Sequence, residues 1–546
     1  MGFFFLFSLF FGNLANNIKT KLMKKVSFLF IISICFLIAQ SVSSQAYSSA
    51  QIDSIVKKAM SINPTAGVAV AVIKDNKVIH SKGYGVTSSI TKEKVNGNTL
   101  FAIASNSKAF TTAALAMLVD QGKLNWLDKV VDYIPEFKMY DSYVTENFNI
   151  QDLLTHRSGL GLGAGDLMFF PDGSDFKIKD VLNSFQYQKP TSAFRTKYDY
   201  DNLLYVVAGE VVARISGVSW AQFVETNIMK PLGMQRSVGV YQRLKDKSNV
   251  AFPHSVENGK LHQLEHYIKN DESLGAAGGI YASVNDLSKW LMMHLNDGKY
   301  GANFNKTMIS KKNHDELWKP HTNIGFNVKP TAPYKTHFNA YGLGWRISDK
   351  GGYITLEHTG GLPGMLSRTI LIPELNVGIV TLTNTDPGGR SYWTIPNLIM
   401  DGYLGVQKTD WISLMEKNLQ QNATQSDAAT KAVWNTVAKA NSKHIKHSDY
   451  IGTYKDNWFG KIKIYEKNKK LWFTSVRSPK LTGEMFFYKA NTFAIKWNYQ
   501  DMPADALAMF TLDEEGKGVR IKMRGISPNI DFSFDFQDLD LKRMKE

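Results

Sequence analysis

Cysteine is almost absent from this sequence of 546 residues, which contains only Cys35. Cys35 lies within the apolar run Val26 to Ala39 near the N-terminus, and the residue before it is not the small residue that lipid attachment requires. We expect this run to be removed, so the mature chain contains no thiol. That excludes a disulfide framework, a cysteine nucleophile and a zinc–thiolate site.

Other signatures of common protein classes are also missing. The net charge is +15, but the lysines are scattered, and no phosphate-binding loop or zinc-finger spacing is present, so no nucleic-acid partner is expected. The glycine run 159–165 does not match G-x-G-x-x-G and is interpreted as a flexible rim near a cleft. No carboxylate completes a recognised metal spacing with His254, His262 or His266, which we interpret as surface residues. We therefore expect no metal and no other cofactor.

The N-terminus has the pattern of a secretory signal peptide. Met23–Lys25 precede the apolar run, and the small residues of Ser41–Ser44 follow it. Cleavage after Ser44 leaves Gln45 first, with no stable membrane span, and predicts a periplasmic or secreted bacterial protein. Residues 1–22 are then superfluous. They reflect either a start placed at Met1 instead of Met23, which we prefer, or a second hydrophobic anchor.

The chain is too long for one ordinary core, and 44% hydrophobic with 21% charged residues is typical of globular proteins. The β-rich run Gly67–Ile73, a turn and a second run at Val78–His80 predict a hairpin. Apolar residues at helical spacing predict a helix from Phe110 to Val119. Further helices are expected at 150–155, 203–215, 220–228 and 286–295, and late strands at 353–358, 368–372 and 377–383.

The composition changes after Gly405. The stretch Gln407–Lys443 is polar and helix-favouring, and we interpret it as a linker that contains a helix. Short β-type runs then predict a small sandwich or barrel, at 461–465, 470–475, 486–488, 493–497, 508–512, 518–523 and 530–536. The expected organisation is residues 1–44 as signal peptide and superfluous start, 45–405 as the catalytic domain, 406–446 as the linker and 447–546 as the β domain.

Ser105-Asn106-Ser107-Lys108 carries the clearest chemistry in the sequence. A serine in the first turn of a helix has a free backbone N–H and lies at the positive end of the helix dipole, so it can attack a carbonyl and help to hold an oxyanion. Lys108, three residues further, lies on the same face and can assist deprotonation. The same S-x-x-K pattern begins at Ser54, Ser89 and Ser174, but only Ser105 opens a strongly apolar helix.

Two later segments complete a pattern with this serine. Residues 198–205 contain the Tyr-x-Asn of Tyr200 and Asn202, and residues 357–361 contain His358-Thr359-Gly360 at a strand end. Together they resemble the serine β-lactamase and penicillin-binding protein superfamily, in the branch of class C β-lactamases, family VIII esterases and D-amino-acid peptidases. The resemblance covers about residues 47–405 and includes the segments 152–160, 277–283 and 341–345. Tyr450–Tyr454 and the following strands resemble the lipocalin-like domain often appended to this branch.

The resemblance implies the fold and the site. The fold class is α/β (α+β), with a β-lactamase/transpeptidase-like catalytic domain, a central antiparallel sheet and a helical subdomain, plus a small C-terminal all-β barrel or sandwich. Ser105 is the implied nucleophile, Lys108 its activating amine and Tyr200 a proton shuttle whose phenolate a neighbouring ammonium favours. The residues implied to bind substrate are Asn202, His358, Thr359 and Gly360, with the backbone N–H groups of Ser105 and Gly361 as the oxyanion hole.

One departure concerns His358, which stands where β-lactamases and carboxypeptidases of this superfamily usually carry lysine. Histidine is mostly neutral at pH 7, so the fixed charge for a substrate carboxylate is lost. The sequence therefore favours a serine hydrolase of esters or D-amino-acid peptides and amides, including cell-wall peptides. The alternatives are a β-lactamase or D,D-carboxypeptidase, and a non-catalytic protein that binds peptidoglycan peptides. His156 and Arg157 are expected to cap a helix that ends at Gly159. The C-terminal domain covers the site, promotes assembly or only packs; the sequence does not fix this or the oligomeric state.

Overall fold

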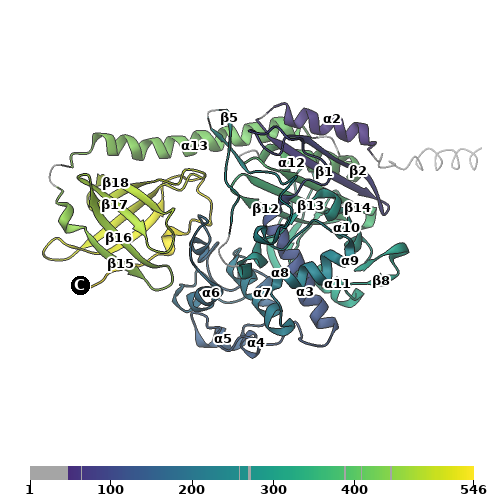
Figure 1. The fold of residues 1–546 in the computed structure, drawn as a ribbon, viewed down its shortest axis with the longest axis horizontal. Helices are drawn as coiled ribbons and strands as arrows, with labels where there is room; N and C mark the ends of the chain where they lie inside the picture. Colours follow the sequence, from purple (N-terminus) through teal and green to yellow (C-terminus); the bar gives the residue numbers. More distant parts are fainter. Residues whose placement is uncertain are drawn as a thin grey trace, which may run out of the picture. The chain divides into compact units, whose positions relative to one another are not determined.

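An eight-stranded antiparallel sheet organises the catalytic part of the chain (Figure 1). The computed structural model describes residues 47–62, 64–257, 259–268, 272–386, 389–406, 409–442 and 445–545, so the predicted signal peptide lies outside the described residues. The strand order is β2-β1-β14-β13-β12-β11-β10-β9. The strands are β1 (Gly67–Lys74), β2 (Lys77–Gly85), β9 (Thr322–Phe326), β10 (Phe338–Tyr341), β11 (Arg346–Lys350), β12 (Tyr353–Leu362), β13 (Met365–Ile372) and β14 (Val377–Thr383). The predicted hairpin and the three late strands are confirmed.

Helices cover both faces of the sheet. Alternate residues of a strand point to opposite sides, so the apolar side chains on each face are buried by helices. Val68, Val70 and Val72 of β1 pack in one cluster with residues of α2 (Ser49–Met60) and α12 (Gly389–Leu404). Ala69, Ala71 and Ile73 belong to the other cluster, which contains α10 (Val284–Leu295) and α3 (Ser107–Asp120). Burial on both sides explains why β1 is apolar throughout.

The second part of the catalytic region is mainly helical. It contains α4 (Val130–Tyr133), α5 (Ser142–Asn147), α6 (Ile178–Ser184), α7 (Leu203–Ser216), α8 (Trp220–Val224) and α9 (Lys230–Leu232), with α11 (Lys311–Leu317) beside α3. The helix expected at 150–155 is only a 3₁₀ turn at Asp152–Leu154, and the one expected at 220–228 continues from α8 into the π-helical turn Glu225–Met229. Across the described ranges no single helix is long and apolar enough to cross a membrane. The pair Leu203–Ser216 and Trp220–Leu232, bent by 73°, meets the same criteria.

The C-terminal part is a closed barrel of eight consecutive strands. They are β15 (Gly452–Asp456), β16 (Gly460–Lys467), β17 (Lys470–Ser475), β18 (Thr482–Lys489), β19 (Thr492–Trp497), β20 (Ala506–Leu512), β21 (Gly518–Gly525) and β22 (Leu541–Arg543). The predicted linker contains the helix α13 (Trp411–Lys439), whose Val433, Trp434 and Val437 pack against the barrel (Figure 1). The strand predicted at Ile530–Phe536 is wrong. Asp531 accepts a hydrogen bond from the Ser533 amide at 2.9 Å, and this local turn replaces strand pairing.

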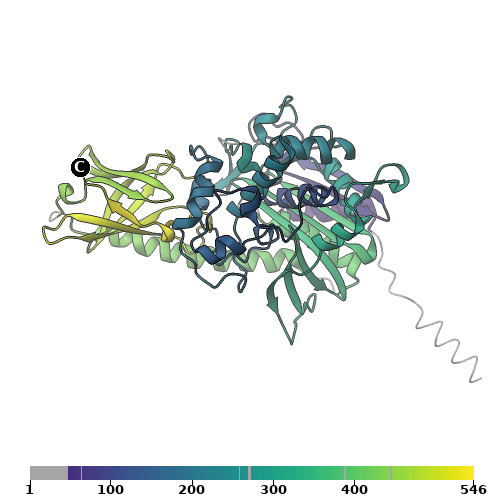
Figure 2. The ribbon, with the colours of Figure 1, turned by 90° about the horizontal axis from the view of Figure 1, so that it is seen from below.

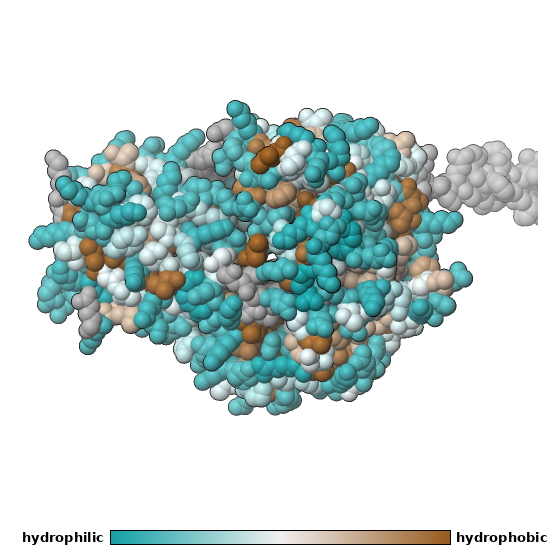
Figure 3. Space-filling view, in the orientation of Figure 1, coloured by the Kyte–Doolittle hydropathy of each residue, from teal (hydrophilic) through white to brown (hydrophobic). Residues whose placement is uncertain are grey.

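Ion pairs join the barrel to the helical part of the catalytic region. Arg477, after β17, binds Asp180 of α6 at 2.7 Å and Asp175 at 2.6 Å. Lys480 binds Asp172 at 2.7 Å. Figure 2 shows the barrel beside the blue part of the catalytic region; Asp180 lies on α6, and Asp172 and Asp175 precede it. The face drawn in Figure 3 is mostly hydrophilic, with apolar atoms in small separate groups.

Candidate active site

The turn that carries Ser105 is held in an uncommon conformation. β3 (Phe101–Ala102) leads into the 3₁₀ turn Ala104–Asn106 and then into α3. Ala104 has φ of 46°, in the left-handed region that residues with a side chain seldom adopt, and such strain clusters at functional sites. Asn106 fixes the turn to β13: its Nδ2 donates to Ser367 Oγ at 2.8 Å, and its Oδ1 accepts from Thr369 Oγ1 at 2.6 Å.

Strand β12 approaches this turn so closely that a glycine is needed. A Cβ on Gly360 would lie 2.2 Å from the carbonyl oxygen of Ile103 and 2.9 Å from the amide nitrogen of Ser105. At Gly361 the closest atom to a Cβ is a Leu366 methyl at 3.4 Å. Gly360 therefore sets the close approach, whereas Gly361 faces the more open side and lines the cavity described below.

Lys108 is fully buried one helical turn after Ser105. Its Nζ lies 3.1 Å from Ser105 Oγ and donates to Asn202 Oδ1 at 2.6 Å and to the carbonyl oxygen of Ala277 at 2.9 Å. The predicted segments 198–205 and 277–283 therefore both meet Lys108 directly. The predicted placement of the amine on the serine's face is confirmed.

Tyr200 lies beside Lys108, as predicted, but the amine lies over the Tyr200 ring and the expected phenolate is not favoured. Nζ of Lys108 lies 4.8 Å from the centre of the Tyr200 ring, over its face. Burial raises the pKa of the Tyr200 hydroxyl above its ordinary value, although the Ser105 hydroxyl lowers it. The expected phenolate is therefore wrong for the free protein, because burial disfavours the charged form more than its neighbours favour it.

His156 holds the loop that carries Tyr200. Its Nδ1 accepts from the Asp201 amide at 3.1 Å and its carbonyl oxygen accepts from the Asp199 amide at 2.9 Å. The ring is buried, with its centre 4.2 Å from that of Tyr200, and burial lowers its pKa well below the ordinary value. The predicted helix cap is wrong for His156, a neutral positioning residue that the sequence analysis missed.

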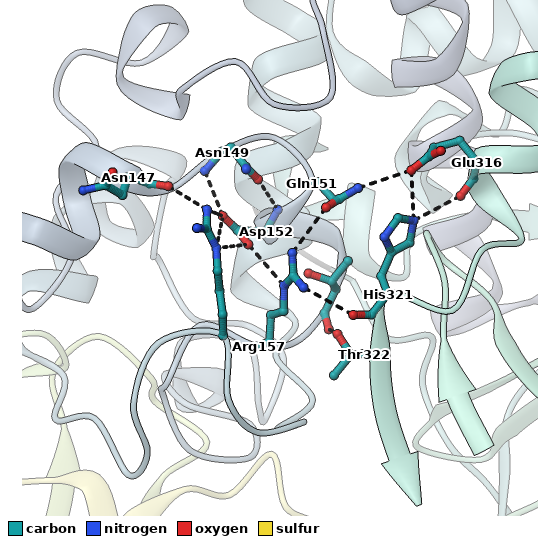
Figure 4. A network of polar contacts seen from close by, with 10 residues as sticks. Asn147, Asn149, Gln151, Asp152, Arg157, Glu316, His321 and Thr322 are labelled. Carbon is teal, nitrogen blue, oxygen red and sulfur yellow. Dashed lines mark hydrogen bonds and ion pairs between the residues drawn. The ribbon is translucent and has the colours of Figure 1, made fainter. Parts of the chain in front are cut away.

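Arg157 does not cap a helix at Gly159 either. It bridges neighbouring segments, binding Asp152 at 3.3 Å, Gln151 Oε1 at 3.2 Å and the carbonyl oxygen of His321 at 3.2 Å (Figure 4). The buried Asp152 that it contacts also binds Arg195. Arg157 therefore stabilises the region next to the site.

The imidazole of His358 is part of the cavity wall. Its Nε2 accepts from the Tyr341 hydroxyl at 2.9 Å, and its Nδ1 donates to the carbonyl oxygen of Thr359 at 2.7 Å. Burial, helped by Arg346 and Lys108, lowers the pKa of His358 to about 3. The ring is therefore neutral, as predicted.

Asp166 extends the polar chain behind Lys108. Its Oδ2 accepts from Asn202 Nδ2 at 2.8 Å, so Asn202 is held from both ends and presents its oxygen to the amine. Burial raises the pKa of Asp166 to about 8, and nearby Asp201 adds to this effect. No motif contains Asp166; its only sequence signal is its position directly after the glycine run.

A cavity of about 420 Å³ opens beside Ser105. Its lining includes all but two of the predicted site residues: Ser105, Tyr200, Asn202, His358, Thr359 and Gly361. The exceptions are Lys108, which lies beneath the wall, and Gly360, which packs against the serine turn. The glycine run, predicted as a rim, contributes Leu162 to the wall.

Arg346 lines the same cavity and was missed by the sequence analysis. It directly follows the segment 341–345 that carried part of the resemblance. Its guanidinium lies 5.6 Å from the centre of the Tyr198 ring. A fixed positive charge is therefore present in the cavity although His358 is neutral.

The histidines 254, 262 and 266 differ from the prediction. His254 and His266 are buried, so their interpretation as surface residues is wrong; His262 is exposed. His254 is buried because its Nδ1 bonds the carbonyl oxygen of Asn384 at 3.0 Å and its Nε2 accepts from the Ser89 amide at 2.9 Å. His266 packs its ring 4.5 Å from that of Tyr241.

One group of residues has donor atoms close enough for a metal ion. Ligand atoms of Asp297, His314 and Asp315 lie within 4.8 Å of one another. Lys311 already binds Asp315 at 2.8 Å and Asp297 at 3.7 Å, so an ammonium balances both carboxylates. These residues are not among those that line the cavity at Ser105.

Comparison with known families agrees with this geometry. A family model described as "Beta-lactamase" matches residues 52–397, so the chain belongs to the beta-lactamase family. Residues 437–543 match a second model, described as "Domain of unknown function (DUF3471)", which corresponds to the barrel.

Two curated relatives with similar sequences have specific names. The chain is 27% identical over 338 residues to unguisins hydrolase ungD' of Aspergillus campestris, covering 61% of this chain and 60% of that protein. It is 26% identical over 344 residues to protein flp of Staphylococcus aureus, covering 62% and 63%. The chain thus spans about three fifths of the length of these relatives.

Solved structures share the fold. An octameric penicillin-binding protein homologue from Pyrococcus abyssi superposes with a TM-score of 0.56 at 18% identity, covering 90% of this chain and 99% of that one. EstCE1, a hydrolase with promiscuous acyltransferase activity, superposes with a TM-score of 0.54 at 18% identity, covering 65% and 99%.

Proposed function

We propose that this protein is a serine hydrolase that acts on esters or on D-amino-acid peptides and amides through an acyl-enzyme on Ser105. The observation that carries the proposal is the buried Lys108 amine 3.1 Å from Ser105 Oγ, at the wall of a cavity. The relatives named as hydrolases support the reaction class. Export to the periplasm or medium, and a small-molecule or peptide substrate, are parts of the same proposal.

The first step is attack by Ser105 on the substrate carbonyl. In this step Lys108 acts as a neutral amine, and the carbonyl oxygens of Asn202 and Ala277 accept hydrogen bonds from it. The amine accepts the serine proton. Oγ forms a bond to the carbonyl carbon as its proton passes to Lys108, and the amides of Ser105 and Gly361 stabilise the oxyanion.

The second step expels the leaving group. The bond from the carbonyl carbon to the leaving oxygen or nitrogen breaks, and the leaving atom takes a proton from the Tyr200 hydroxyl, which recovers one from Lys108. A raised pKa suits Tyr200 to this role as a neutral relay. Water then attacks the acyl-enzyme, gives its proton to the same groups, and the acid leaves as Ser105 regains its hydrogen.

Arg346 favours a second candidate, a β-lactamase or D,D-carboxypeptidase. Substrates of these reactions carry a carboxylate, and a guanidinium in the cavity can bind it with two hydrogen bonds. If this candidate is right, Arg346→Gln lowers kcat/KM for a carboxylate-bearing substrate by about 10-fold or more but leaves a neutral ester unaffected. Equal effects on both substrates would remove the support.

Labelling with a fluorophosphonate separates hydrolysis from binding alone. Wild-type protein should be labelled and should turn over a nitrophenyl acetate, whereas Ser105→Ala should do neither. Ser89→Ala is a matched control, because Ser89 begins one of the other S-x-x-K patterns. If wild type and Ser105→Ala behave alike, the chain is a binding protein on this scaffold. A panel of nitrophenyl esters, D-aminoacyl anilides and nitrocefin then ranks the substrate classes.

A further inference from the structure

The barrel contributes a wall of the cavity that contains Ser105. Asp531, Phe532 and Ser533 lie between β21 and β22 and line this cavity together with Ser105 and Tyr200. Residues of the catalytic region and of the barrel therefore meet at one site. Figures 1 and 2 both show the barrel beside α6, in agreement with the ion pairs of Arg477.

The segment is fixed to the catalytic part by a buried aspartic acid side chain. Asp535 is fully buried and accepts from the amides of Gly165 at 2.7 Å and Leu167 at 2.9 Å. These amides flank Asp166, which holds Asn202. The barrel thus docks on the turn that supports the amine of Lys108, and the docking places the residues before Asp535 at the cavity.

Phe532 is held at the tip of this segment. The Asp531 carboxylate accepts from the Ser533 amide at 2.9 Å, and its carbonyl oxygen accepts from the Phe534 amide at 3.0 Å. On the other side Gly163 packs so closely that a Cβ there would lie 2.7 Å from Phe532 Cδ2. Gly163 also donates its amide to the carbonyl oxygen of Tyr200 at 2.8 Å. Phe532 therefore has a defined place relative to the proton relay.

The ring of Phe532 faces the cavity and is only partly covered. It is 38% exposed, and its centre lies 6.0 Å from that of Tyr200 with the rings at 82°. The adjacent lining from Leu162, Phe169, Phe170 and Met502 is apolar. Because Tyr200 protonates the leaving atom in the proposed mechanism, a ring beside Tyr200 lies on the leaving-group side of the site.

We infer that Phe532 of the barrel is a specificity-determining residue that limits the size of the leaving group accepted beside Tyr200. The inference rests on the proposed function, because it assumes that Ser105 is acylated and that Tyr200 protonates the leaving atom. It assigns the barrel a direct part in substrate selection and predicts a preference for small leaving groups.

The test compares acetate esters of alcohols from ethanol to octanol on the purified full chain, followed by the release of acetic acid. Phe532→Ala should raise kcat/KM for octyl acetate relative to ethyl acetate about 10-fold, which corresponds to about two more methylene groups buried. Phe532→Trp should shift the ratio the other way. Phe326→Ala is the matched control, since Phe326 is a 70% exposed phenylalanine on β9 that does not line the cavity.

The outcomes separate the inference from the proposed function. An unchanged chain-length ratio in both Phe532 variants, with turnover that still depends on Ser105, overturns the inference and leaves the hydrolase intact. Absence of turnover and of fluorophosphonate labelling in the wild type overturns both. If circular dichroism shows that Phe532→Ala is unfolded, the opposite shift expected for Phe532→Trp tests the inference in its place.

Discussion

Asp166 gives the sharpest test of the buried chain behind Lys108. We expect Asp166→Asn to become more stable relative to the wild type as the pH rises from 5 to 8. The amide keeps the shape of the side chain and an oxygen that can accept from Asn202. It lacks the carboxyl group whose pKa burial raises to about 8.

The direction in which wild-type stability changes with pH follows from proton binding. Between the unfolded aspartate pKa of about 3.9 and the folded value, the folded protein holds a proton that the unfolded chain has released. Wild-type stability therefore falls as the pH rises through this window and levels off above it. The contribution is full below about pH 4.

The change in the free energy of unfolding has an upper limit. One proton costs at most about 1.4 kcal/mol per pH unit, so three units cost about 4 kcal/mol. A domain of 150–250 residues shifts its Tm by about 2–4 °C per kcal/mol, and a larger one by about half of that. The Tm difference between variant and wild type should therefore grow by about 4–8 °C from pH 5 to pH 8.

Thermal unfolding followed by tryptophan fluorescence, with both proteins in the same buffers, measures this difference. Asp128→Asn is the control. Against the effect of burial, hydrogen bonds from Tyr133 and Asn125 lower the pKa of Asp128, so its variant should show a constant offset over this range. A difference for Asp166→Asn that stays flat or shrinks with pH would refute the assignment of a neutral acid at this position.

Two further substitutions test the backbone and the buried charges. Gly360→Ala should lower kcat/KM about 100-fold, because its Cβ would push β12 away from the nucleophile turn. Gly361→Ala should retain most activity. Equal rates of ester hydrolysis by the two variants would contradict this. Glu357→Gln leaves the buried cations of Arg368, 2.6 Å away, and Lys350, 2.8 Å away, without their acid. It should cost about 3–5 kcal/mol in thermal unfolding, and an unchanged Tm would show that the pairs contribute little.

The reacting groups could be predicted because short segments carry them. S-x-x-K spans one helical turn, and Tyr-x-Asn and His-Thr-Gly each span three residues, so their internal geometry is nearly local. The alternation of apolar residues likewise revealed the central strands. These patterns predicted the meeting of Ser105, Lys108 and Asn202 that the structure shows.

The surroundings could not be predicted because tertiary contacts create them. Asp166 lies in no motif, and although His156 and Arg346 lie in or directly after segments that carry the resemblance, their positions at the site depend on tertiary contacts. Burial also reversed the direction expected for the pKa of Tyr200. Apolar residues alternate from Ile530 to Phe536 as in a strand, yet a turn formed by one aspartate breaks the pairing.

The helix α13 has a consequence for how strongly the barrel must bind. It has 29 residues and is roughly 44 Å long, and its Trp411 donates to Asp401 of α12 at 2.6 Å while Trp434 packs on Phe486 of the barrel. Such a semi-rigid tether restricts where its far end can travel and so maintains a high effective concentration of the docking partner. The tether therefore adds to the ion pairs, the buried Asp535 and the aromatic contacts, such as Phe176 with Phe459, that dock the barrel.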